Sequence, residues 1–212
     1  MRLALVKLLL LAGVACAAPL AAQETETPEA LLARCEDEEG EACSDLGIAH
    51  LEGTAVIADS GRARALFEQS CKLKHLKGCY NLALALADGV GGPPNVRRAV
   101  DLYRAACYQK HPLACNNLGV LYDYGHGVPR NGLTAAVFYE NACQAGNPKG
   151  CLNGARLYKG NRGVRLDEAK VAALLGRGCD LREPRACKAV GREDPSPPPA
   201  PAPADTAAAV EP

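Results

Sequence analysis

The chain has 212 residues, and its 24 Lys plus Arg balance its 24 Asp plus Glu, so the formal net charge is zero. This balance argues against nucleic acid or an anionic membrane surface as the main partner, because both attract proteins with an excess of basic residues. Aromatic residues make up only 4% of the chain, with two Phe and no Trp. A core of small apolar side chains suits closely packed helices better than a β-sandwich.

The first segment has the layout of a secretory signal peptide. Arg2 and Lys7 precede an apolar run over residues 8–14, and small residues follow, whereas a membrane span needs roughly 20 apolar residues. We therefore expect residues 1–22 to be a signal peptide, no membrane span, and export to the periplasm or the extracellular space. Cys16 raises the question of a lipoprotein anchor, but Gly13 stands where such a motif usually has Leu, so we do not expect one.

Ten further Cys residues form five pairs with a fixed period. Within each pair the separation is 8 residues, and successive pairs are 36 residues apart: Cys35 and Cys43, Cys71 and Cys79, Cys107 and Cys115, Cys143 and Cys151, and Cys179 and Cys187. A period of this length is typical of a stacked repeat protein. Two residues eight apart on one helix lie about 12 Å apart, whereas a disulfide needs Cα atoms within roughly 7 Å. If the pairs are bridged, the chain must turn back between them, and each bridge joins the two helices of a hairpin.

Metal binding is the rival use of ten Cys residues. Zinc sites usually bring two ligands close together in a CxxC motif, which this chain lacks. A secretory leader also places the chain in an oxidising compartment. The sequence therefore favours five disulfides, and we expect no metal and no cofactor.

The other columns of the repeat predict where helices begin and end. Preferred N-cap residues stand twelve positions before each later first Cys, and the first unit starts with Thr27 followed by Pro28; the later caps are Asp59, Asn95, Asn131 and Asp167. Glycine commonly follows the last residue of a helix. The residues expected to end the second helices are Gly53, Gly89 and Gly125, with Asn161 in the fourth unit. The pattern predicts ten short helices in five hairpins, an all-α, α/α superhelix (solenoid) over residues 27–191. Residues 192–212 are rich in Pro and Ala, and we expect them to be a disordered tail.

The segment that starts at Leu102, LYRAACYQKHPLACNNLGVLYDYGHGVPRN, resembles the Sel-one-like repeat, a relative of the tetratricopeptide repeat. The 36-residue length and the paired Cys resemble the disulfide-rich Helicobacter cysteine-rich protein type. That resemblance implies a tetratricopeptide-like solenoid with one disulfide per repeat. It also implies that the protein binds penicillin or weakly hydrolyses β-lactams, as a β-lactamase does.

The residues themselves show no catalytic motif. A serine β-lactamase needs SxxK, and no Ser of the mature chain is followed three residues later by Lys. The four His form neither HxH nor HExxH, as a zinc hydrolase would require. His75 and His111 share a column that holds Glu or Asn in the other units, which we interpret as a polar turn position. We expect His50, which stands in an apolar column, to be a packing residue.

One polar column suggests a binding surface. Two residues after each second Cys stand Asp45, Asn81, Asn117 and Asn153. Asn is unfavourable inside a helix, so a ladder of such residues needs a reason. In one interpretation they line the concave surface and bind the backbone of an extended peptide; in the other they bond to the adjacent helix and stabilise stacking.

Three functions follow from these observations. The first is an exported, monomeric scaffold or adaptor that binds a protein or peptide in a concave groove. The second is a protein that binds or weakly hydrolyses β-lactams. The third is a redox or assembly factor whose disulfides exchange.

Overall fold

The computed structural model describes residues 26–160 and 162–192, and every regular element within them is a helix. The first two hairpins are α1 (Pro28–Glu36) with α2 (Gly40–Glu52), and α3 (Ser60–Lys72) with α4 (Leu76–Asp88). The next two are α5 (Val96–Tyr108) with α6 (Pro112–Tyr124), and α7 (Gly132–Gln144) with α8 (Pro148–Lys159). The last is α9 (Glu168–Asp180) with α10 (Pro184–Ala189). These ten helices confirm the predicted α-solenoid, whereas the predicted signal peptide and the tail from residue 193 onward lie outside the described residues.

The first helix of every hairpin begins at a side chain that caps it. A side-chain oxygen of each predicted cap accepts a hydrogen bond from the backbone N–H three residues later, at Thr27, Asp59, Asn95, Asn131 and Asp167. These bonds satisfy N–H groups that no carbonyl of the same helix can reach.

The second helices end where the sequence predicts in the first three units. Gly53, Gly89 and Gly125 follow α2, α4 and α6 with φ between +72° and +76°, a conformation that favours glycine. In the fourth unit α8 ends at Lys159, and Gly160 follows with a φ of −82°. Asn161, which we expected to end this helix, lies outside the described residues.

All five Cys pairs form disulfides, as the sequence favours, and each bridge connects the end of the first helix of a hairpin to the start of the second. Their Cα atoms lie 4.3–4.6 Å apart, well within the reach of a disulfide. The bridges join Cys35 to Cys43, Cys71 to Cys79, Cys107 to Cys115, Cys143 to Cys151, and Cys179 to Cys187. The chain therefore turns back between the two Cys residues of every pair.

The two helices of a hairpin also approach closely beside each bridge. The residue before each second Cys is small and buried, at Ala42, Gly78, Ala114, Gly150 and Ala186. A Cβ atom added at Gly150 would lie 2.5 Å from the Cβ atom of Ala142, and one added at Gly78 would collide with the side chain of Ser70. The helices therefore meet too closely for a larger residue there.

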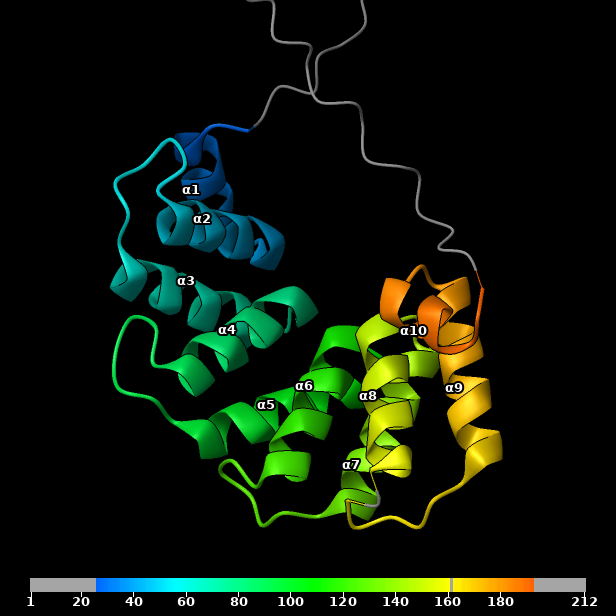
Figure 1. The fold of residues 1–212 in the computed structure, drawn as a ribbon. Coiled ribbons are helices and arrows are strands. Elements are labelled where there is room, and N and C mark those ends of the chain that lie inside the picture. The colour runs from blue at the N-terminus through cyan, green and yellow to red at the C-terminus, as the bar shows by residue number, and fades with distance from the viewer. Residues whose placement is uncertain (1–25, 161, 193–212) are drawn as a thin grey trace, which may run out of the picture.

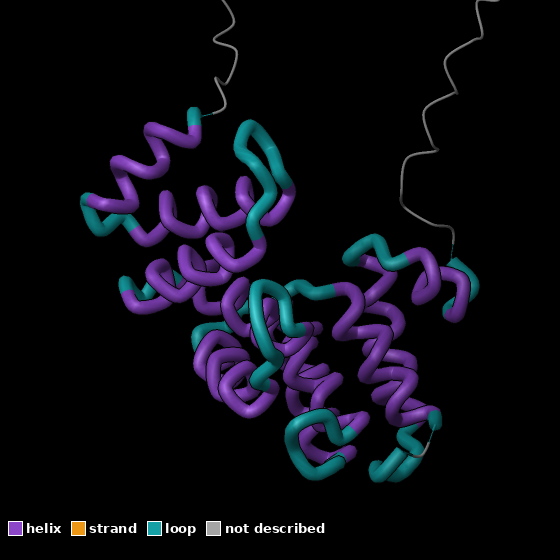
Figure 2. The backbone as a smooth tube through the Cα atoms, turned by 90° about the vertical axis from the view of Figure 1, so that its left-hand side faces the viewer, coloured by secondary structure: helices purple, strands orange, loops and turns teal. Residues whose placement is uncertain are grey.

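The hairpins stack into an arc with the second helices on its inner side (Figure 1). Each helix contacts the next one along the chain, and α2 also contacts α4 while α6 contacts α8. The view at right angles shows the helix pairs stacked along the whole described chain (Figure 2). The arc therefore has an outer row of first helices and an inner row of second helices.

Aromatic rings from the outer row fill the space beneath the inner row. Phe67, Tyr103 and Tyr139 are at most 2% exposed. A Cβ atom at Gly47 would lie 2.6 Å from the ring of Phe67, and one at Gly119 would lie 2.7 Å from the ring of Tyr139. Small residues on the inner helices thus make room for rings of the following outer helices.

Candidate functional site

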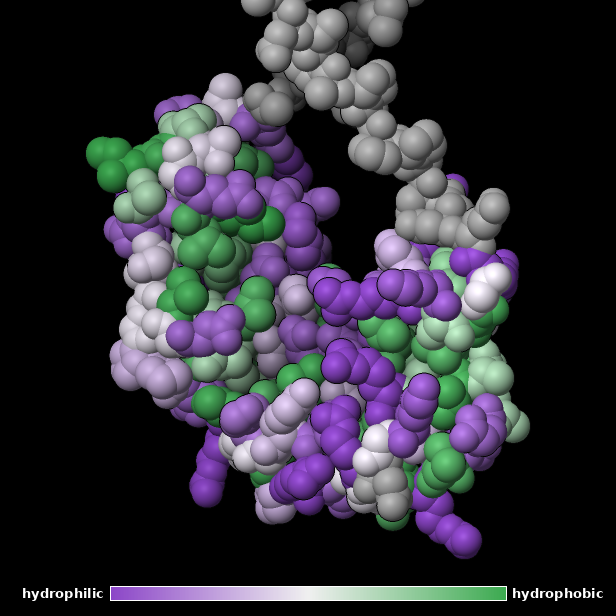
Figure 3. All heavy atoms as spheres, in the orientation of Figure 1, coloured by the Kyte–Doolittle hydropathy of each residue, from purple (hydrophilic) through white to green (hydrophobic). Residues whose placement is uncertain are grey.

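The inner helices form a groove with two adjoining hollows. The first hollow, about 240 Å³, lies between α2 and α4 and is lined by Ile48, Leu51, Glu52, Phe67, Asn81, Leu84, Ala85, Asp88 and Val90. The second, about 210 Å³, lies between α4 and α6 and is lined by Leu84, Ala87, Asp88, Tyr103, Asn117, Val120 and Leu121. Because the hollows share Leu84 and Asp88, we treat them as one surface and call it the inner groove. The space-filling view shows the arc hollowed between its two arms (Figure 3).

The groove combines apolar walls with amide groups from the polar ladder. Leu51 and Leu84 are large apolar residues that remain 42% and 38% exposed. Asn81 lines the first hollow and Asn117 the second, and both are half-buried. An apolar concave surface with a few fixed polar groups is typical of a binding site.

Each ladder Asn also forms a hydrogen bond to the preceding hairpin, always to the residue 37 positions earlier. The Nδ2 atom of Asn81 donates to the Oγ atom of Ser44 at 3.3 Å. The equivalent bonds run from Asn117 to the hydroxyl of Tyr80 at 3.5 Å and from Asn153 to the Oδ1 atom of Asn116 at 2.9 Å. Asp45, at the start of the ladder, accepts instead from the Nζ atom of Lys77 at 2.7 Å.

Asn117 has the most contacts of the ladder. Its Nδ2 atom also lies 3.4 Å from the hydroxyl of Tyr103, and its Oδ1 atom accepts from Asn116. Burial raises the pKa values of Tyr80 and Tyr103 above the ordinary value for tyrosine. Both hydroxyls therefore stay protonated, and their oxygen lone pairs accept from the amide.

These bonds link the two interpretations of the ladder. They join consecutive hairpins, as the stacking interpretation predicts. An amide has two N–H donors and an oxygen with two lone pairs. In the bonds described above, Asn81 and Asn153 each use one N–H group, whereas Asn117 uses both N–H groups and one lone pair of its oxygen. Each of the three amides therefore retains at least one lone pair for a ligand. A fixed amide that retains hydrogen-bonding capacity is preorganised for a ligand.

The formal charge changes sign between the two ends of the arc. The column that contains Ile48, Leu84 and Val120 continues as Arg156 on α8, while the column with Glu52 and Asp88 continues as Tyr124. Over the described ends, residues 26–52 contain nine acidic residues and one basic residue, whereas residues 148–192 contain eleven basic and four acidic residues. The formal charges are therefore −8 and +7, although the whole chain is neutral.

Two buried Ser residues and His50 occupy structural positions. Ser44 and Ser70 are fully buried, and the Oγ atom of Ser70 donates to the carbonyl oxygen of Gly40 while lying 3.4 Å from the Nδ1 atom of His75. A buried hydroxyl of this kind is inaccessible to a substrate. His50 is 8% exposed, and its Nδ1 atom lies 3.3 Å from the carbonyl oxygen of Ile57, as expected for a packing residue.

The His75 and His111 column has a specific role in the structure. Its members, Glu39, His75, His111, Asn147 and Glu183, are the N-cap residues of the second helices. The side chains of His111, Asn147 and Glu183 accept backbone hydrogen bonds from Ala114, Gly150 and Arg185. The polar turn position that the sequence indicates is therefore a helix cap.

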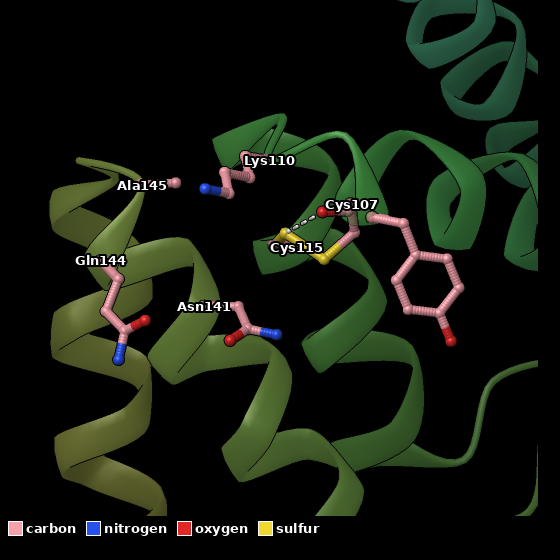
Figure 4. A pocket seen from close by; sticks show the side chains of 7 residues that line it. Cys107, Lys110, Cys115, Asn141, Gln144 and Ala145 are labelled. Carbon is pink, nitrogen blue, oxygen red and sulfur yellow. Dashed lines mark hydrogen bonds between the residues drawn. A yellow bond between two sulfur atoms is a disulfide. The ribbon is translucent and has the colours of Figure 1, made fainter.

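A third hollow, about 320 Å³, lies beside the Cys107–Cys115 bridge and outside the inner groove. Figure 4 shows Lys110 extending towards Ala145, with Asn141 and Gln144 on the neighbouring helix. The two Cys residues are nevertheless only 5% and 1% exposed. Because thiol–disulfide exchange needs access to a sulfur atom, the hollow by itself does not make this bridge reactive.

Within residues 26–160 and 162–192, no three His, Cys, Asp or Glu side chains gather in a way that could hold a metal ion. None of the helices described above is long and apolar enough to cross a membrane. The five disulfides indicate an oxidising, exported environment.

The fold and the groove together define a class of protein: an α-helical repeat solenoid with one disulfide in each hairpin. The family model described as Sel1 repeat matches residues 40–75, 76–111 and 112–147, and each match begins at the first residue of an inner helix. The chain belongs to the Sel1 repeat family.

Solved structures with the same fold agree with this assignment. A protective antigen of uropathogenic Escherichia coli with an SLR fold is 24% identical with a TM-score of 0.73, and a Sel1 repeat protein from Oxalobacter formigenes is 23% identical with a TM-score of 0.66. The matches cover 77% of this chain in both cases but only 35% and 63% of those proteins. Helicobacter pylori cysteine rich protein B is 25% identical with a TM-score of 0.50, over 65% of this chain and 98% of that one. No curated protein sequence matches the chain.

Proposed function

We propose that this protein is an exported scaffold or adaptor whose inner groove binds an extended segment of a polypeptide partner. One observation carries the proposal: Asn81 and Asn117 line two adjoining apolar hollows on the concave side. Apolar hollows accept side chains of a bound segment, and the amides pair with its backbone without demanding a particular sequence. The ladder residues Asp45, Asn81, Asn117 and Asn153 are thus both stacking contacts and ligand contacts.

Selection from a random library of displayed 12-residue peptides tests this function. We expect the oxidised protein to enrich peptides. The triple variant Asn81→Ala, Asn117→Ala and Asn153→Ala should lose most of this enrichment, because it lacks the amides that pair with the peptide backbone. Circular dichroism checks that the variant keeps its helicity.

Two further variants separate binding from folding. Leu84→Arg copies the residue that this column has on α8 and obstructs both hollows from an exposed position, so it should also lose the enriched peptides. Asn141→Ala removes an exposed amide from α7, outside the groove, and should retain them. A protein that enriches no peptide, or a Leu84→Arg variant that binds as well as the parent, would contradict the proposed function.

A further inference from the structure

Two carboxylates lie at the edge of the apolar hollow between α2 and α4. Glu52 is at the end of α2 and Asp88 at the end of α4, and both side chains line the hollow. Its other walls include Ile48, Leu51 and Leu84. The hollow thus has aliphatic sides and a negatively charged edge.

The two carboxylates have no basic partner within residues 26–160 and 162–192. Other acidic residues between consecutive hairpins do: Asp45 pairs with Lys77 at 2.7 Å, and Glu68 pairs with Arg98 at 2.9 Å. For Glu52, the side-chain contact is a hydrogen bond that it accepts from the hydroxyl of Thr54 at 3.3 Å. The edge of the hollow therefore keeps a negative potential that the surrounding structure does not neutralise.

Resting on the proposed function, we infer that this hollow takes a Lys or Arg side chain of the bound segment. Such a side chain has an aliphatic stem and a charged end, and it buries the stem on apolar surface while the charge stays at the edge. The stem would contact Ile48 and Leu84, and the cation would lie between Glu52 and Asp88. A purely apolar side chain would leave both carboxylates without a partner, and an acidic one would be repelled.

The α8 end of the inner row carries the opposite charge, which supports the same orientation of the bound segment. Arg156 occupies the column of Ile48 and Leu84 on α8, and both Arg156 and Lys159 are exposed. A basic side chain is therefore favoured at the α2–α4 end of the groove and disfavoured near α8. This change of sign gives the bound segment a direction along the arc.

Three capped pentapeptides test the inference: GLKLG and two matched peptides in which Lys is replaced by norleucine or by Glu. Each is titrated into the ¹⁵N-labelled, oxidised protein at low salt, with backbone amide shifts as the readout. We expect GLKLG to shift the signals of residues 48–52 and 84–90 and to bind about fivefold tighter than the norleucine peptide, because two partly exposed ion pairs form. Added salt should weaken only the Lys peptide.

A charge-matched pair of variants identifies the groups responsible. Glu52→Gln with Asp88→Asn should reduce GLKLG binding to the level of the norleucine peptide. Glu36→Gln with Asp37→Asn makes the same change in charge at the exposed α1–α2 turn and should leave binding unchanged.

The outcomes distinguish this inference from the proposed function. If all three peptides shift the groove signals with equal affinity, or if the Glu52 and Asp88 variant binds GLKLG like the parent, the groove binds peptides but the inference is overturned. If none of the peptides shifts any groove signal, both the inference and the proposed function are overturned.

Discussion

At the scale of single residues, the fold depends on glycines at positions where neighbouring atoms leave no space for a larger side chain. Gly78 lies against Ser70, whose hydroxyl donates a hydrogen bond to the carbonyl oxygen of Gly40 in the preceding hairpin. One position thus affects contacts within a hairpin and between two hairpins. By contrast, nothing lies within 4 Å of a Cβ atom placed at Gly176 on α9.

These two glycines give a matched pair of substitutions. Gly78→Ala should lower the free energy of unfolding by about 1–3 kcal/mol, because the methyl group displaces Ser70 from a filled core. Gly176→Ala should leave stability unchanged or raise it by up to about 1 kcal/mol, since Ala is the better helix former. Urea unfolding of the oxidised proteins measures both, and equal effects of the two changes would contradict this account of the hairpin contact.

At the scale of helices, the repeat columns of the sequence predict most of the fold. The caps of the first helices, such as Asp59 and Asn95, are recognisable because Asp or Asn recurs at a fixed distance before Cys. The caps of the second helices are harder to recognise, because their column varies among Glu, His and Asn, and each of these residues is also common in turns. The role of Glu52 and Asp88 is harder to predict for another reason: their column changes to Tyr124 in the third unit, and the hollow that both residues line forms only when α2 packs beside α4.

The cap of α6 predicts a pH dependence. The Nδ1 atom of His111 accepts from the N–H of Ala114 at 3.2 Å, and the ring stacks on Tyr80. Burial lowers the pKa of His111 below its ordinary value. The unfolded chain therefore binds a proton at this residue first, so the stability that the neutral ring contributes is present above about pH 6.5 and is lost as the pH falls below it.

His111→Asn tests this cap, because Asn147 performs the same role in α8 with a 2.7 Å bond to Gly150. The variant should match the parent in urea unfolding at pH 7.5 and lose less stability than the parent at pH 5.5. His126→Asn, at an exposed position, serves as the control and should behave like the parent at both values. A parent and a His111 variant with the same pH profile would exclude the role of this ring.

At the scale of the whole molecule, the solenoid is a one-dimensional stack in which helices contact mainly their neighbours along the chain. The bridges act within hairpins, so coupling between hairpins depends on packing, the ladder bonds and ion pairs such as the one between Arg162 and Asp123 at 3.0 Å. In such a stack, a defect in the middle affects both sides and a defect at the end affects one.

Removing bridges at different places tests this coupling. Cys107→Ala with Cys115→Ala and Cys179→Ala with Cys187→Ala should each cost about 2–3 kcal/mol locally, because each bridge closes a short loop. The central variant should speed amide hydrogen exchange in the hairpins on both sides, whereas the terminal variant should speed it only in α9 and α10. Uniform acceleration over the whole chain in both variants would show a single cooperative unit instead.

The short span of every bridge has a consequence for how the protein matures. Partners only eight residues apart, such as Cys35 and Cys43 or Cys143 and Cys151, can meet as soon as one hairpin has entered an oxidising compartment, without waiting for distant sequence. Oxidation can then proceed from the first hairpin to the last, and each closed loop removes two thiols from the pool that would otherwise shuffle. We therefore expect oxidation in chain order to limit mispairing in this cysteine-rich chain.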